Sequence, residues 1–116
     1  RNSAMNNMNL LGRIAKTPET RTAGNTAITT LIVATDRVKL NNEGKSYKDP
    51  QTGYTAKETE FHKVTLFNGL GKAVAENKEK GDMIAIEGRL HYTRWQDQGG
   101  VERFGCEVIG EKVHFC

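Results

Sequence analysis

The order of strand and helix signals constrains the fold of this chain more than any other feature. Five stretches show the alternation or β-branched enrichment that is typical of β-strands, and one helix-like stretch lies between the third and the fourth. The chain contains no internal repeat and no low-complexity segment. The expected strands are 7–15, 27–35, 60–67, 82–95 and 101–115, and the expected helix is 68–81.

Five short strands with one covering helix suggest a small closed barrel, because closure removes exposed sheet edges. The order matches the OB-fold, whose oligonucleotide-binding face lies around the second and third strands. The sequence therefore predicts an all-β protein, a five-stranded Greek-key barrel of the OB type with one helix between strands 3 and 4.

The helix has recognisable boundary signals. Asn68 is the expected N-cap, and Lys78 and Lys80 are expected in the last turn, where they would complement the helix dipole. Gly81 suits the left-handed position that follows a helix. Leu70 and Val74 form a thin apolar stripe, so the helix should lie against the barrel surface.

Two connections differ in length. Residues 16–25, with Pro18 and Gly24, are expected to form a turn region. Residues 38–58 are polar and rich in turn signals, and they are expected to form a long arm or loop. A connection of that length in a compact domain is often functional.

Bulk properties set limits on the class of protein. The 116 residues suit one domain, expected to span 5–116, and residues 1–4 are expected to be a vector-derived remnant ahead of a natural start at Met5. A net charge of +3 and a pI near 9.0 permit a polyanionic partner without demanding one. No apolar run approaches the length of a membrane span and no signal peptide is recognisable, so we expect a cytoplasmic, nucleoid-associated protein.

The third strand carries the clearest functional pattern. Alternation places Phe61, Lys63, Thr65 and Phe67 on one face, with His62, Val64 and Leu66 on the other. Exposed aromatic rings beside a cation are what single-stranded nucleic acid requires, since bases stack on the rings and phosphates pair with the charge. The alternative is that a bend in the barrel turns both phenylalanines into the core.

Catalytic and metal patterns are weak. His62 alternates onto the Val64 face, which indicates a buried or interface histidine, and no nucleophile or carboxylate pair accompanies it. Cys106 suits a small buried apolar residue. A zinc site of Cys106, Cys116, His91 and His114 can be drawn, but its spacing matches no common pattern. We therefore expect no enzyme activity, no metal and no cofactor.

Several short motifs occur in a fixed order along the chain. They include Asn-Leu-Leu-Gly-Arg-Ile at 9–14, Thr-Glu-Phe-His-Lys-Val at 59–64, Glu-Gly-Arg-Leu at 87–90 and Arg-Trp-Gln-Asp at 94–97. Together they resemble the bacterial single-stranded DNA-binding protein family over nearly all of residues 7–113. The resemblance implies an OB-fold homotetramer that coats single strands without sequence preference in replication, recombination and repair.

The resemblance also implies site residues. The family's stacking rings fall on Phe61, Phe67 and Trp95, although tryptophan is commoner than phenylalanine at Phe61. A further family tryptophan falls near Lys39, and Tyr47 and Tyr54 of the arm are suspected replacements. His62 falls near a subunit interface. The family's cations at Lys63, Arg94 and Lys80 are matched, while Gly69 and Thr93 replace usually basic residues. The expected phosphate contacts are Lys63, Arg94, Lys80, Arg89, Arg21 and Lys39.

One alternative function stays open. Relatives end in an acidic tail that recruits replication and repair proteins, whereas this sequence stops at Cys116 without one, so we expect either a truncated sequence or a member that lacks this recruitment. With the lost tryptophan, this leaves a second hypothesis: an OB-fold protein-interaction subunit of a primosome-like complex that binds DNA weakly.

Overall fold

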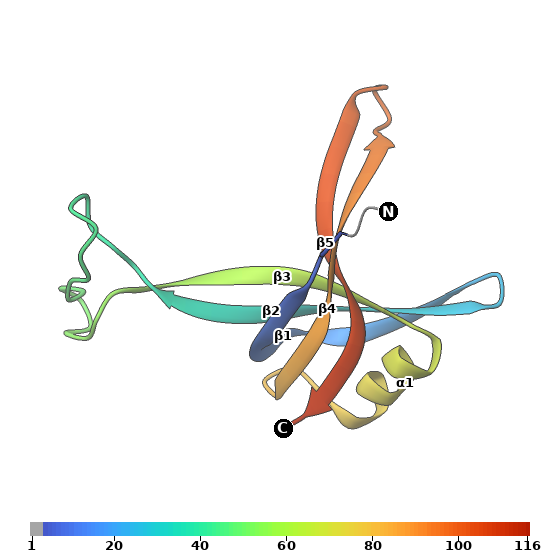
Figure 1. The fold of residues 1–116 in the computed structure, drawn as a ribbon, viewed down its shortest axis with the longest axis horizontal. Coiled ribbons are helices and arrows are strands. Elements are labelled where there is room, and N and C mark those ends of the chain that lie inside the picture. Colours follow the sequence, from blue (N-terminus) through green and yellow to red (C-terminus); the bar gives the residue numbers. More distant parts are fainter. Residues whose placement is uncertain (1–3) are drawn as a thin grey trace.

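The computed structural model describes residues 4–116, so the expected vector remnant lies outside the described residues except for Ala4. Within this range five strands close into a barrel in the order β1-β2-β3-β5-β4, with one helix between β3 and β4 (Figure 1). This confirms the predicted OB-fold. The elements are β1 (Met8–Ala23), β2 (Thr26–Val38), β3 (Lys57–Phe67), α1 (Asn68–Asn77), β4 (Met83–Gln96) and β5 (Glu102–Phe115).

The barrel closes through a short parallel contact. β3 and β5 pair only Val64 with Val108 and Thr65 with Ile109, whereas the other neighbouring strands are antiparallel. Beyond the barrel the β1–β2, β2–β3 and β4–β5 hairpins project in three directions (Figure 1). The β4–β5 hairpin therefore stands away from β3 where their pairing ends.

Alternation in the strands builds the core. Inward side chains such as Leu31, Val33, Val64 and Ile84 are fully buried, and α1 adds Val74 to the same cluster. Leu70 packs partly buried against it, so the predicted apolar stripe is the face by which α1 covers the barrel. No helix in the described part of the chain is long and apolar enough to cross a membrane.

The prediction of a turn region at 16–25 is wrong. β1 continues to Ala23, which pairs with Thr26, and the turn is confined to Gly24 and Asn25. Two register shifts in β1, after Ile14 and after Lys16, absorb the irregular residues. Pro18 lies within the second shift. The regular ladder of hydrogen bonds is interrupted there, so the backbone N–H that proline lacks is not needed.

The predicted helix ends need correction. Asn68 is the first residue of α1, not its N-cap, and its side-chain Oδ1 accepts a hydrogen bond from the backbone N–H of Ala27 (3.1 Å). α1 ends at Asn77, so Lys78 and Lys80 lie outside the last turn. Gly81 has the predicted left-handed backbone (φ 99°), but it serves the turn into β4, where its N–H bonds to the carbonyl of Ile14.

Two further expectations change. The arm expected at 38–58 is residues 39–56, folded back on itself by bridges between Leu40 and Ser46 and between Lys48 and Thr55. Cys106 was predicted to be buried, and it is exposed. The reason is that β5 enters the barrel only near Val108, so Cys106 belongs to the projecting hairpin.

Candidate nucleic-acid interface

The outer face of β3 carries the predicted aromatic pair. Phe61 and Phe67 are 66% and 41% exposed, while Val64 and Leu66 are fully buried. Both rings thus lie on the surface, and the alternative that they belong to the core is wrong. Thr65 shares their face but is buried where β3 pairs with β5, and its hydroxyl donates a hydrogen bond to the carboxylate of Glu107 on β5.

Cross-strand pairing aligns these rings with arginines of β1. Phe61 pairs with Ala34 of β2, and Ala34 pairs with Arg13; Phe67 pairs with Ile28, and Ile28 pairs with Arg21. Directly paired residues point to the same side of a sheet, about 10 Å apart over two strand spacings. Each ring therefore has a guanidinium in its own row, at a distance that suits a base on the ring and a phosphate on the arginine.

Arg13 was missed by sequence reasoning, although its alternation with Gly12 and Ile14 marks it as outward-facing. Arg13 and Lys80 line one hollow of 340 Å³ together with Ala34. This places the predicted cation Lys80 beside the Phe61 row. Lys63 lies between the rings, paired with Ile32.

The β4–β5 hairpin carries the third predicted ring. Trp95 is 51% exposed and leans over Gly105, since a Cβ at Gly105 would lie 3.1 Å from Cζ3 of the indole. Trp95 pairs with Arg103, whereas Arg94 pairs with Phe104. Trp95 and Arg94 are successive residues of β4, so their side chains point to opposite faces of the hairpin.

Arg94 is held by its own hairpin. Its Nε donates to the carboxylate of Glu102, and its guanidinium lies 5.9 Å from the centre of the Phe104 ring. Phe104 and Tyr92 are 70% and 72% exposed on this side. Both rings were missed by the sequence analysis, although the hairpin turn at 97–100 sets the register that places Phe104 opposite Arg94.

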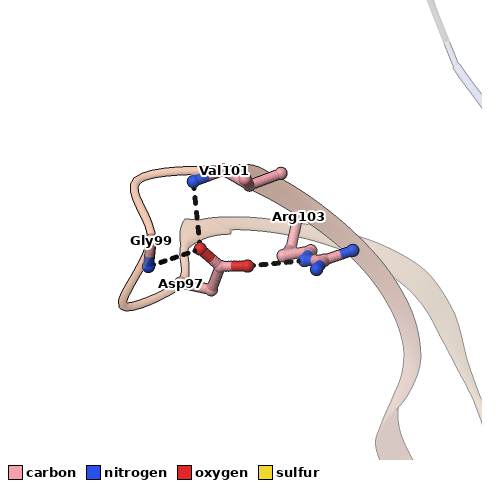
Figure 2. Close-up of polar contacts among 4 residues, drawn as sticks. All are labelled: Asp97, Gly99, Val101 and Arg103. Carbon is pink, nitrogen blue, oxygen red and sulfur yellow. Dashed lines mark hydrogen bonds and ion pairs between the residues drawn. The ribbon is translucent and has the colours of Figure 1, made fainter.

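The turn of this hairpin is organised by Asp97. One carboxylate oxygen accepts the backbone N–H groups of Gly99 and Val101 (3.0 Å each), and the other accepts Nε of Arg103 (2.9 Å; Figure 2). These bonds, that from Val101 foremost, favour the ionised form and lower the pKa of Asp97. The turn thus fixes Arg103 directly opposite Trp95.

The remaining predicted residues lie on β4 and on the arm. Arg89 is exposed on β4 and pairs with Ile109, while Lys39 starts the arm through a backbone bond to Ala56. Tyr47 and Tyr54 lie on the arm, 37% and 78% exposed.

Two features bear on the histidine and metal expectations. His62 is half-buried and its Nε2 bonds to the hydroxyl of Thr35 (2.8 Å). Within residues 4–116, no three His, Cys, Asp or Glu side chains gather as they would around a metal ion.

A family model and a solved structure both match nearly the whole chain. The model of the Single-strand binding protein family matches residues 5–116. A solved structure of the Plasmodium falciparum single-strand binding protein in complex with single-stranded DNA superposes with a TM-score of 0.77 at 18% identity, covering 100% of this chain and 98% of that one. At 18% identity this structural likeness supports the fold alone. The family match includes the residues of the outer face of β3 and of the β4–β5 hairpin. This chain belongs to the single-strand binding protein family.

Proposed function

We propose that this protein is a sequence-tolerant binder of single-stranded DNA and has no catalytic role. The observation that carries the proposal is the outer sheet face, where Phe61 and Phe67 each share a row with an arginine of β1. Bases stack on such rings whatever their identity, because every base has a π-face. Family membership and the DNA complex of the structural neighbour support the same function.

Charge on this face supplies the phosphate contacts. Among the described residues, Arg13, Arg21, Lys63 and Lys80 take part in no ion pair, so a phosphate can pair with them without first breaking a salt bridge. Arg94 differs, because it is already paired with Glu102. A phosphate has to displace Glu102 before the phosphate can pair with Arg94. Arg89, Lys39, Tyr47 and Tyr54 extend the proposed contacts along β4 and the arm.

The cellular role follows from the family. We expect the protein to coat exposed strands during replication, recombination and repair as a homotetramer, with His62 near a subunit interface. The cytoplasmic location stays a prediction.

The test uses Trp95, the chain's single tryptophan. Long oligo-dT is titrated at two salt concentrations while Trp95 fluorescence is followed, with duplex DNA as control. Quenching by oligo-dT that weakens at high salt supports the proposal, since counterion release makes phosphate binding salt-dependent. Unchanged fluorescence together with no gel shift would favour the primosome-type interaction subunit.

A further inference from the structure

A cleft separates β3 from β5 beyond the point where their pairing ends, and we infer that it receives one nucleobase of the bound strand and favours cytosine over thymine. The inference rests on the proposed function and extends it to one subsite. The cleft has a volume of 230 Å³. A protein cavity of about 150 Å³ already binds benzene, so a pyrimidine ring fits this one.

The walls of the cleft join the outer sheet face to the hairpin. β3 contributes Phe61 and Lys63, and the opposite wall contains Leu90 of β4 and Cys106 of β5. Phe61 is already an exposed stacking ring in line with Arg13, so a strand that lies on Phe61 reaches the cleft without leaving the interface. Lys63 stands at the same wall, where it can pair with the adjoining phosphate.

Glu107 gives the cleft its chemical preference. Glu107 lines the cleft, its carboxylate accepts a hydrogen bond from the hydroxyl of Thr65, and a carboxylate has acceptor capacity for more than one bond. A carboxylate repels phosphate but accepts a hydrogen bond from the exocyclic N4 amine of cytosine. Thymine presents a carbonyl oxygen at that position, which the carboxylate cannot bind.

Cys106 allows occupancy of the cleft to be measured directly. In a Cys116→Ser variant, Cys106 is the remaining thiol, and its alkylation rate by N-ethylmaleimide is measured with and without oligo-dC. With free oligo-dC at ten times its Kd, the rate should fall about tenfold, because only the unbound fraction reacts. The matched control is Cys106→Ser, whose Cys116 lies at the other end of the barrel beside Lys78 and should react equally with and without DNA.

Glu107→Gln tests the base preference. The amide keeps the volume and an acceptor for Thr65, but it loses the charge and can donate to thymine O4. The ratio of oligo-dC to oligo-dT affinity should fall about three- to tenfold relative to the wild type, which corresponds to one hydrogen bond. Glu111→Gln removes the same charge from the same strand outside the cleft, and it should leave the ratio unchanged.

The outcomes separate the two proposals. Full reactivity of Cys106 while Trp95 fluorescence reports bound DNA would overturn the subsite and leave the proposed function standing. An unchanged affinity ratio in Glu107→Gln, with a melting temperature like that of the wild type, would overturn the cytosine preference. No binding of either oligonucleotide by the wild type would instead overturn the proposed function itself.

Discussion

Arg13 of β1 and Phe61 of β3 lie in one row across the sheet, with only Ala34 of β2 between them. Ala34 contributes only a methyl group to this row, and it lines one hollow together with Arg13. The same arrangement recurs with Arg21, Ile28 and Phe67, so one face repeats a pairing of positive charge and aromatic ring. Such repetition suits a polymer whose phosphates and bases alternate.

Removal of either ring should weaken DNA binding. Phe61→Ala and Phe67→Ala are each expected to cost about 1–3 kcal/mol of binding free energy for oligo-dT, the usual value for one base–aromatic stack. Phe115→Ala is the matched control, since Phe115 is 49% exposed on β5 near Lys78, away from this face. Affinities measured by fluorescence anisotropy check the prediction, and equal affinity of Phe61→Ala and Phe115→Ala would contradict it.

Arg13→Ala should change the salt dependence of binding. If Arg13 neutralises one phosphate, the slope of log K against log salt becomes shallower by about 0.7, the value for one contact to a single strand. Arg37→Ala serves as control, because Arg37 is already paired with Glu58 of β3. Titrations at four salt concentrations give both slopes, and parallel lines for wild type and Arg13→Ala would exclude Arg13 from the interface.

Glu102 should act as a competitor for the phosphate that Arg94 binds. Glu102→Gln releases Arg94, so oligo-dT affinity is expected to rise and its salt dependence to steepen. In an Arg94→Ala background the same substitution should have a much smaller effect, which a double-mutant cycle measures as coupling. Glu111→Gln controls for the change in net charge. Additive effects of the two substitutions would show that the ion pair does not restrain Arg94.

These contacts also show how far the sequence could be read. The exposure of Phe61 and Phe67 was predictable, because alternation within one strand is a local property. The row that joins Phe61 to Arg13 was not, since it depends on two register shifts in β1 that only the folded barrel defines. Asn68 was misread as a cap because its bond to Ala27 spans two distant segments. Where the prediction failed, the deciding contact joined segments that are distant in the sequence, so the local pattern of residues did not contain it.

The hairpin should lose stability in acid. The hydrogen bonds of Asp97 lower its pKa, so its contribution is complete above the ordinary aspartate pKa and is lost as the pH falls through the lowered value. Asp97→Asn should therefore be less stable than the wild type at pH 7, and the difference should shrink below about pH 4. Urea unfolding followed by Trp95 fluorescence measures this difference in the free energy of unfolding at each pH, with Glu43→Gln on the arm as control. A difference that stays constant with pH would contradict this role for the carboxylate.

Gly88 should be required for closure of the barrel. It lies at the register shift between β4 and β5, and a Cβ there would collide with the backbone carbonyl of Ile109, which cannot move without breaking the ladder. Gly88→Ala is expected to destabilise the protein by about 1–3 kcal/mol, as overpacking of a rigid site does. Gly69→Ala is the matched control, because a Cβ at Gly69 of α1 meets no atom within 4 Å and alanine favours the helix. Urea unfolding of both variants decides the question. Equal stability of the two would mean that β5 shifts to admit the methyl group, and the short contact between β3 and β5 would then be adjustable instead of fixed.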